Sequence, residues 1–552
     1  MTPLNNDSNP DKNYILAFGL AMLVLIAYPF FLKIVSPPAK PAAVEVEQKT
    51  HQAVEPLGTA SSLKPAEGLS ALGTQAAKPA ILQFENNLYS VKFSTLGATV
   101  NELVFKGDGQ SRVDQTVFFT GNAGEPGIFG VRLLNEEADL SGAVFKLSRS
   151  EAKANFYEFV YEKPGEYRVF KKYVFDTEKP VIRLTVSVEN LSGRERHFPL
   201  ELTYGLDYQI TPRYTDHDFE GVTAGEKIQS ANLGKIAKKG FSVLENVSWS
   251  GLVKKYFAVL VKTDSKTISA DFRSDEKSLW STLRLEPLTV GPAAGGKREF
   301  LIYAGPQRYE TLKALGFGDL LSRGFFGILK IGFLIALKFL NQFVHNFGWA
   351  IILLTVLIKG AFTPLTHMSF QSMKKMQALQ PKLKNLQERY KGDPSKLNKE
   401  MMGLYKRNKV NPMGGCLPML LQIPIFIAFY QVLNETIELK GAPFIFWIRD
   451  LSEPDRLFQL PFSIPFIGDS FNFLPLLMIA SQYYQQKLTP QAGMTPEQTK
   501  MMEFMPLIFG VMFYQMPSGL VLYWFINNTL SVIHQIFVKR MVVVLHHEDH
   551  DS

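Results

Sequence analysis

The chain has 552 residues, of which 46% are hydrophobic, and a formal net charge of +8. This length exceeds one ordinary domain, and the single cysteine, Cys416, excludes an internal disulfide and a multi-cysteine metal site. A phosphate-binding glycine loop of the G-x-x-x-x-G-K-[ST] type and an HExxH motif are both absent, so the sequence gives no support for ATP hydrolysis or zinc proteolysis.

The first apolar segment, Ile15–Ile34, is longer than the apolar region of a cleaved signal peptide, which is about 7–15 residues. Pro37 and Pro38 stand where cleavage would require small residues. We therefore expect an uncleaved transmembrane anchor at 15–35, preceded by a cytoplasmic N-terminus at 1–14. Residues 36–79 are rich in Ala, Pro, Glu, Gln and Ser, a composition typical of a flexible linker.

Residues 80–315 have the pattern of a β domain. Val181–Glu189 alternates strictly between apolar and polar residues. Further segments rich in β-branched and aromatic residues are Tyr89–Phe105, Asn155–Tyr161 and Tyr167–Phe175. Many short strands separated by turn signals such as Pro164-Gly165 predict an all-β sandwich of two sheets.

One polar cluster in this domain resembles an acid–base pair. His217 lies between Asp216 and Asp218, and such a cluster would suit a periplasmic carbohydrate enzyme. The alternative is a solvated loop of ordinary turn-forming residues, which we favour.

Residues 316–342 are predicted to form an amphipathic helix in the membrane–water interface. Arg323, Lys330 and Lys338 interrupt an apolar pattern over Phe317–Leu340. Apolar and basic residues on opposite faces are typical of helices that lie in the interface.

The next apolar segment, Phe347–Thr366, is long enough to span a bilayer and carries Lys359, with Thr355 one turn earlier on the same face. A lysine at the centre of a membrane helix costs roughly 2.5–3.5 kcal/mol on insertion scales. A buried cation beside a hydroxyl indicates a hydrated cavity inside the membrane. The alternative is that Lys359 reaches the headgroups by snorkelling.

The loop at 371–410 is strongly basic, with nine lysines and two arginines against three acids over Gln371–Lys409. A break at Gly392-Asp393-Pro394 divides two helical segments and predicts a cytoplasmic helical hairpin. Its apolar residues recur at a spacing that packs one helix against another. They are Met376, Leu379, Leu383, Leu386, Leu397, Met401 and Leu404. Basic, methionine-bearing apolar faces suit transient contact with anionic lipid or with an apolar peptide, and the alternative is that the hairpin is only a spacer.

Four further spans are predicted at Met413–Leu433, Phe471–Gln485, Phe504–Met516 and Leu520–Phe537. They complete a five-span core at 343–538, with a periplasmic loop at 435–468 and a cytoplasmic loop at 487–500. Polar residues and one proline recur inside these spans. We predict that these residues converge with Lys359 and Thr355 on a hydrated groove. They are Gln422, Pro424, Gln482, Tyr523, Trp524 and Asn528. Single polar residues in spans often only join helices, which is the alternative interpretation.

The charge distribution predicts the topology. With six spans and the basic loop inside, both termini, including the tail at 539–552, are cytoplasmic and the β domain is outside. A large outer domain without a disulfide fits the periplasm, which indicates a multi-pass protein of a bacterial inner membrane.

The runs LIKGAFTPLT, KMQALQPKLKNLQERYKGD, EMMGLYKRNKVNPMGGCLPMLLQIPIFIAFY, FWIRDLS and FMPLIFGVMFYQMPSGLVLYWFINN resemble the YidC/Oxa/Alb family of membrane protein insertases. The likeness is to the Gram-negative form, with an extra first span and a periplasmic domain, and covers essentially the whole chain.

The resemblance implies a mixed fold, with a polytopic α-helical membrane core and a periplasmic all-β supersandwich. It also implies an insertase and chaperone for nascent inner-membrane proteins, with a cytoplasmic hairpin whose apolar residues receive the substrate. The groove would be open to cytoplasm and lipid, and the chain would act alone or with the Sec translocon, with transient ribosome contacts through the cytoplasmic loops. Partners would include membrane lipids but not DNA. No cofactor, no metal, no catalytic residue and no enzyme activity are expected.

Two features depart from the family pattern. Lys359 stands where the family usually has arginine, and lysine lacks the planar fork of a guanidinium. The tail is acidic and histidine-rich rather than strongly basic, which argues against direct ribosome binding by the tail.

One rival function is a secondary transporter or channel that uses Lys359 as an ion or substrate site. Transporters often contain inverted repeats, and no internal repeat is visible here. The basic hairpin would also have no role in a transporter.

Overall fold

The structure is a computed structural model that describes residues 79–109, 115–122, 124–133, 140–151, 155–210, 216–390, 392–410, 417–464, 467–489 and 496–548. The N-terminal segment 1–14, the anchor 15–35 and nearly all of the linker 36–79 lie outside these residues.

The β domain contains two main antiparallel sheets. A four-stranded sheet has the order β1 (Ile81–Glu85), β2 (Tyr89–Ser94), β3 (Thr99–Phe105) and β4 (Thr116–Thr120). The main path of a twelve-stranded sheet has the order β13 (Ile228–Asn232), β12 (Phe219–Ala224), β14 (Phe241–Lys254), β15 (Phe257–Ser274), β18 (Gly295–Pro306), β9 (Val181–Asn190), β8 (Tyr167–Phe175), β7 (Phe156–Lys163) and β6 (Lys146–Glu151). Beside this path, β11 (Leu200–Asp207) pairs with β5 (Gly130–Leu133) and with β16 (Ser278–Leu285), and β16 also pairs with β15.

Smaller elements complete the domain. They are the strand pair β10 (Arg196–Phe198) and β17 (Leu288–Val290), the 3-10 turn η1 (Asp216–Asp218), and the helices α2 (Leu233–Lys239), α3 (Tyr309–Ala314) and α4 (Asp319–Ser322).

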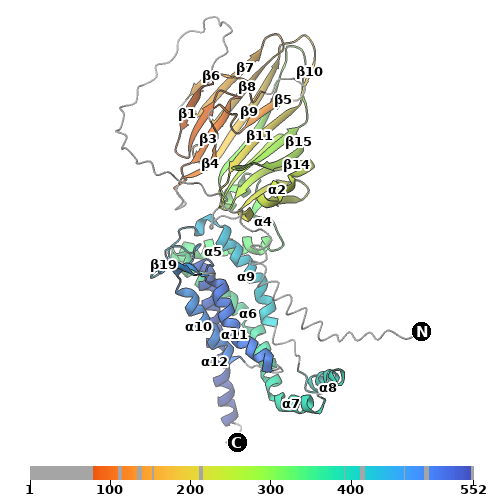
Figure 1. The fold of residues 1–552 in the computed structure, drawn as a ribbon, viewed down its shortest axis with the longest axis vertical. Helices are drawn as coiled ribbons and strands as arrows, with labels where there is room; N and C mark the ends of the chain where they lie inside the picture. Colours follow the sequence, from red (N-terminus) through yellow and green to blue (C-terminus); the bar gives the residue numbers. More distant parts are fainter. Residues whose placement is uncertain are drawn as a thin grey trace, which may run out of the picture. The chain divides into compact units, whose positions relative to one another are not determined.

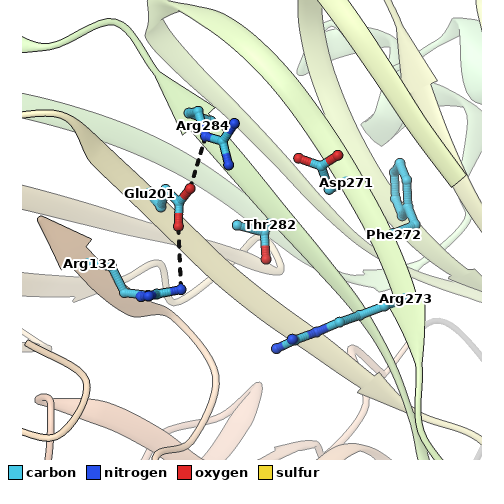
Figure 2. A pocket seen from close by; sticks show the side chains of 7 residues that line it. All are labelled: Arg132, Glu201, Asp271, Phe272, Arg273, Thr282 and Arg284. Carbon is cyan, nitrogen blue, oxygen red and sulfur yellow. Dashed lines mark hydrogen bonds and ion pairs between the residues drawn. The ribbon is translucent and has the colours of Figure 1, made fainter. Parts of the chain in front are cut away.

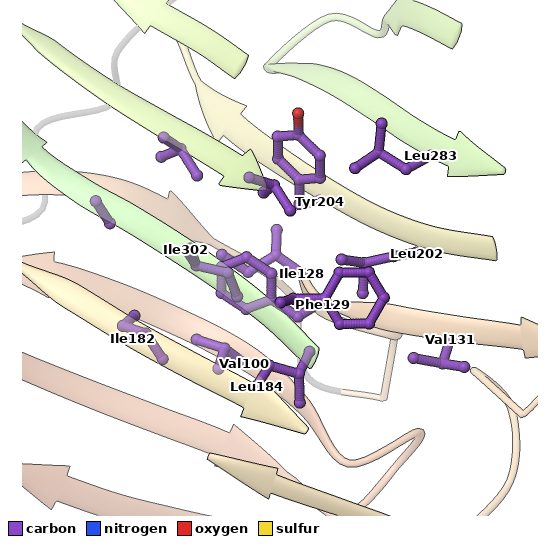
Figure 3. Packing of buried hydrophobic residues seen from close by; sticks show 14 of the residues in the cluster. Val100, Ile128, Phe129, Val131, Ile182, Leu184, Leu202, Tyr204, Leu283 and Ile302 are labelled. Carbon is purple, nitrogen blue, oxygen red and sulfur yellow. The ribbon is translucent and has the colours of Figure 1, made fainter. Parts of the chain in front are cut away.

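The two main sheets share one hydrophobic core. Figure 3 shows Val100, from the four-stranded sheet, close to Ile182, Leu184 and Ile302 of the large sheet, and all four side chains are fully buried. The predicted sandwich is therefore confirmed. The alternating segment is β9, whose residues Ile182, Leu184, Val186 and Val188 face this core because successive strand residues point to opposite faces.

The helical part contains α5 (Gly327–Val344), α6 (Phe347–Ala378), α7 (Gln380–Arg389), α8 (Pro394–Arg407), α9 (Leu417–Glu435), α10 (Leu474–Leu488), α11 (Pro496–Phe513) and α12 (Ser518–Glu548). Helix α12 contacts α6, α9 and α10, and α10 also contacts α11 (Figure 1). Their facing sides form a second hydrophobic cluster that includes Ile351, Phe429, Met478 and Leu520.

The helix that holds Lys359 extends beyond the predicted span. The side chain of Asn346 caps α6 by accepting hydrogen bonds from the backbone N–H groups of Gly348 (2.8 Å) and Trp349 (3.3 Å). The helix then passes through Pro364 and ends at Ala378, so the start of the basic loop continues the membrane helix.

The helix expected at 316–342 is divided. It consists of α4 and α5, with Gly324 between them in a left-handed conformation (φ +85°). By length and composition alone, α5 and α6 are each long and apolar enough to cross a membrane.

Two lysines of α5 are paired with acids. Lys330 is buried, and its Nζ lies 2.8 Å from Glu435 at the end of α9. The Nζ of Lys338 lies 2.7 Å from Glu310 and 3.3 Å from Glu438. The charges that interrupt the apolar pattern therefore fix α5 to neighbouring segments.

The loop expected at 435–468 is structured. It contains the 3-10 turn η3 (Ile437–Leu439) and the strand β19 (Phe458–Ile464). This strand forms a hairpin with β20 (Gly468–Phe471) at the end of the loop. The indole Nε1 of Trp447 donates to Asp455 Oδ2 at 2.8 Å. Our sequence analysis did not predict the hairpin.

Candidate functional site

Lys359 lies on α6 and meets polar partners from α12. Its Nζ donates to Asn527 Oδ1 (3.2 Å) and to Ser531 Oγ (2.6 Å). The Ser531 hydroxyl in turn donates to the backbone oxygen of Asn527 at 2.8 Å. Among the residues that the structure describes, no acid forms an ion pair with Lys359, and the hydrogen-bond acceptors of its ammonium are two neutral oxygens.

A small cavity lies beside this cluster. Its volume is about 30 Å³, roughly the share of one water molecule in the liquid. Its polar lining residues are Lys359, Thr366, Gln422 and Asn527, and aliphatic and aromatic side chains of α6 and α9 supply the rest. The site can hold one polar group next to a cation in otherwise apolar surroundings.

Gln422 and Tyr523 join α9 to α12. The amide nitrogen of Gln422 donates to the hydroxyl of Tyr523, which is buried and packs against the ring of Phe429. Pro424 lies in the same helix, two residues after Gln422. Tyr523 therefore closes the site on the side of the hydrophobic cluster.

The other polar residues of α12 face α10. The indole nitrogen of Trp524 donates to Gln482 Oε1 (3.3 Å), and the amide of Asn528 lies 3.4 Å from Ser481 Oγ. These contacts join two helices, and none of the three predicted residues among them lines the cavity beside Lys359.

Thr355 is buried, and its hydroxyl bonds to the backbone of its own helix. Its hydroxyl donates to the backbone oxygen of Ile351, one turn earlier, at 2.7 Å. It does not line the cavity beside Lys359, although the two residues are one turn apart.

Besides Thr366, the site contains two polar residues that are absent from our predicted set, Asn527 and Ser531. Both lie on one stripe of α12 with Tyr523, because residues four apart share a helix face. This stripe meets α6 and α9, while the neighbouring stripe of Trp524 and Asn528 meets α10. The polar residues therefore form two adjacent clusters.

The predicted hairpin contains two helices, α7 and α8, after the continuation of α6. The helix breaks at Leu379, two residues before Pro381, whose ring disrupts a continuing helix. The apolar set is shielded from solvent to different extents. Met376, Leu379, Leu383 and Leu404 are buried, and Leu386, Leu397 and Met401 are half-buried.

The DHD motif of the β domain has a structural explanation. His217 Nδ1 lies 2.9 Å from the amide nitrogen of Asn232, whose Oδ1 caps α2 by accepting from Lys235 N at 3.0 Å. The imidazole thus positions a helix cap on an exposed loop.

Two family models match the chain. The model of the 60Kd inner membrane protein matches residues 339–545, and the model of the YidC periplasmic domain matches residues 81–336. A solved structure described as an active YidC insertase with the first transmembrane domain resolved aligns with 83% of this chain and 92% of its own, at 18% identity and a TM-score of 0.36.

Curated relatives match over nearly the full length. The membrane protein insertase YidC of Syntrophus aciditrophicus is 33% identical over 565 residues, which cover 96% of this chain and 99% of the relative. The YidC insertase of Pelobacter propionicus is 33% identical over 557 residues, with the same coverage of both chains. The chain therefore belongs to the YidC family of membrane protein insertases.

Proposed function

We propose that this chain inserts nascent proteins into the bacterial inner membrane and helps them to fold there. The observation that carries this proposal is the 33% identity to curated insertases over 96% of the chain, which includes both the β domain and the helical core. The β domain lies in the periplasm. The chain is not an enzyme in the chemical sense, because transfer of a polypeptide into lipid makes and breaks no covalent bond.

The Lys359 cluster is the centre of the proposed transfer path. The ammonium of Lys359 donates to Asn527 and Ser531 and has no counter-charge among the residues that the structure describes, so it would attract an acidic or polar segment of an incoming chain. Gln422, whose amide also lines the cavity, adds a second hydrogen-bonding group on the facing helix. Each of these two polar groups shortens the apolar part of the membrane that a polar tail must cross.

The other predicted groove residues have supporting roles in this proposal. Gln482, Trp524 and Asn528 hold α10 against α12, and Tyr523 holds α12 against α9. Thr355 and Pro424 shape α6 and α9, from which Lys359 and Gln422 project. Widening of the site for a substrate would therefore require these helices to separate, since the present cavity holds about one water molecule.

The driving force comes from the substrate. Its apolar helix of about 20 residues leaves water for lipid, at roughly 25 cal/mol per Å² of apolar surface removed from water. The protein lowers the barrier for the polar tail and is unchanged at the end. Nucleotide hydrolysis is unnecessary for this cycle.

The proposal extends to topology and partners. We propose six spans with both termini in the cytoplasm, and a hairpin at 371–410 whose seven apolar residues receive the substrate helix. Basic residues outnumber acids in this loop by eleven to three, a composition suited to contact with anionic lipid headgroups. Cooperation with the Sec translocon and transient binding of the ribosome are further parts of the proposal.

Reconstitution tests the function directly. Purified chain in liposomes, supplied with a newly synthesised single-span substrate, should protect the substrate's tail from external protease, whereas empty liposomes should not. In parallel, release of trapped small solutes should be unchanged by the chain. Solute flux that Lys359→Ala abolishes, without tail protection by the wild type, would instead support a transporter or channel.

A further inference from the structure

The loop between α9 and α10 (residues 436–473) is held in place by a buried carboxylate. One oxygen of Asp455 accepts hydrogen bonds from the backbone N–H groups of Phe473 (2.9 Å) and Leu474 (2.8 Å), at the start of α10. The same oxygen accepts the hydrogen bond from the indole of Trp447. The α9–α10 loop is therefore fixed to the first turn of α10.

Further hydrogen bonds join the α9–α10 loop to α11 and α12. The side-chain amide of Asn472 donates to the backbone oxygen of Tyr514 at 2.6 Å, and the backbone N–H of Asn472 donates to the Tyr514 hydroxyl at 2.9 Å. Tyr514 directly follows α11. The backbone N–H of Ser518, the first residue of α12, donates to the backbone oxygen of Glu453 at 2.7 Å. The loop thus covers the end of the bundle at which α10 and α12 begin and α11 ends.

This fixed loop nevertheless exposes large aromatic side chains. Phe446 is 85% exposed, Phe462 is 60% exposed, and Phe458 is half exposed. Burial in the protein would normally stabilise such side chains, and the hydrogen bonds leave the loop little freedom to bury them by moving. Exposed aromatic residues on a rigid segment indicate a surface that contacts something outside the protein.

The backbone at Phe446 supports this interpretation. Its φ is +58°, in the left-handed region, which is unusual for a bulky side chain. The turn is closed by a hydrogen bond from the backbone N–H of Phe444 to the backbone oxygen of Ile448 at 2.9 Å. The protein thus maintains a costly backbone conformation at its most exposed aromatic residue of this loop, as is typical of functional surfaces.

The α9–α10 loop also carries exposed charges. Arg449, Arg456 and Asp469 are exposed, and Arg456 lies 3.3 Å from Glu453. Charged side chains are costly in hydrocarbon, whereas the boundary between hydrocarbon and headgroups accepts both charges and aromatic rings. The composition of the loop therefore fits the headgroup region of a bilayer.

The β domain has a hollow whose charges, by contrast, are engaged within the domain. Its volume is about 330 Å³, and Figure 2 shows Glu201 between Arg132 and Arg284. The Glu201 carboxylate lies 2.9 Å from Arg284 Nε and 3.7 Å from an Arg132 guanidinium nitrogen. The charge of Arg273, which also lines the hollow, acts on Asp275. These internal pairs account for the charges of the hollow, whereas no internal contact accounts for the exposed rings of the α9–α10 loop.

We propose that the α9–α10 loop is an aromatic anchor in the headgroup region of the periplasmic leaflet. The inference rests on the proposed topology, in which α9 and α10 are spans and this loop is periplasmic. Because the loop covers the ends of the helices, its exposed rings lie where the hydrocarbon meets the headgroups. Phe446, Phe458 and Phe462 enter this boundary, and the exposed charges face the headgroups. The anchor holds the outer ends of the helices while the bundle opens around Lys359 for a substrate.

The test attaches the environment-sensitive fluorophore NBD to single cysteines of the full chain in liposomes of phosphatidylcholine and phosphatidylglycerol. Cys416→Ser removes the native thiol, and Phe446→Cys or Phe462→Cys supplies the labelled position. The quenchers are lipids that carry a nitroxide either near the headgroup or near the end of the acyl chain. Two exposed leucines serve as controls. Leu357→Cys lies on α6 within a predicted span, and Leu244→Cys lies on β14 of the β domain.

We expect the labels at 446 and 462 to emit at shorter wavelength than the label at 244. They should also lose more intensity to the nitroxide near the headgroup than to the deep nitroxide. The label at 357 should be quenched by nitroxide lipids, and the label at 244 should not.

Three results would overturn the anchor while leaving the topology intact, provided that the label at 357 is quenched. The labels at 446 and 462 could behave like the label at 244, which would place the loop in water. They could be shifted to shorter wavelength without quenching by either lipid, which would mean that protein covers the loop. They could be quenched more by the deep nitroxide, which would place the loop in the hydrocarbon. Absence of quenching at 357 would contradict the membrane placement of α6 and overturn the topology and the anchor together.

Discussion

Lys171 of the β domain provides a test of the structure through pH. This lysine lies on β8 at an inward-facing position and is fully buried. Its Nζ donates to the backbone oxygens of Gly97 and Phe129, each at 2.8 Å. Burial lowers the pKa of the Lys171 amine well below its ordinary value. The structure therefore contains an amine whose protonation opposes folding.

The sign of the effect follows from proton binding. Between the lowered pKa of Lys171 and its ordinary value of about 10.4, the unfolded chain carries a proton that the folded chain lacks. The free energy of unfolding should therefore rise with pH across this interval. The slope from one proton is at most about 1.4 kcal/mol per pH unit.

The assay is urea unfolding of residues 79–323, followed by tryptophan fluorescence at several pH values between 7 and 10. The wild type should gain stability with rising pH relative to Lys171→Met, which has no amine at this position. Lys172→Met is the matched control, because the next residue of β8 is only half-buried and should keep the wild-type pH dependence. Parallel pH profiles for the wild type and Lys171→Met would refute the reasoning.

Two further predictions concern packing and charge. A Cβ atom at Gly127 would lie 2.1 Å from the backbone oxygen of Val100. Gly127→Ala should therefore lower the free energy of unfolding of the β domain by about 1–3 kcal/mol, measured by thermal or urea unfolding. The control is Gly193→Ala, where the added Cβ meets open space and the free energy of unfolding should not fall. In the helical core, Lys330→Met and Glu435→Gln should show a favourable coupling energy of about 0.5–3 kcal/mol in a double-mutant cycle. The cycle is measured by unfolding in detergent, and additive effects of the two substitutions would contradict the ion pair.

The strands could be predicted because their signal is local. Alternation over Val181–Glu189 and the turn at Pro164-Gly165 each depend on a few neighbouring residues, and the structure has strands and a turn at these places. The buried position of Lys171 was beyond such reasoning, since its acceptors lie 74 and 42 residues away in the chain. The β19–β20 hairpin was missed because apolar residues there merge with those of the adjoining spans.

The candidate site was predictable in part for a similar reason. A lysine inside an apolar span indicates a functional site, because a charge is costly in the membrane. The polar pairs four residues apart in α12 indicate the polar stripes of that helix. Which stripe meets Lys359 depends on how α12 is rotated against α6, and periodicity contains no information on that rotation. Asn527 and Ser531 therefore became visible as partners only through the packing of the two helices.

The most direct test of the account is complementation of a bacterial host depleted of its own insertase, with translocation of the tail of a single-span substrate scored by protease protection. The wild-type chain should restore protection. Lys359→Glu should lose protection, because a carboxylate would repel an acidic tail and cannot donate to Asn527 Oδ1 and Ser531 Oγ as the ammonium does. Lys359→Ala should give less protection than the wild type. Full activity of Lys359→Glu, at wild-type expression, would contradict an electropositive transfer site at this position.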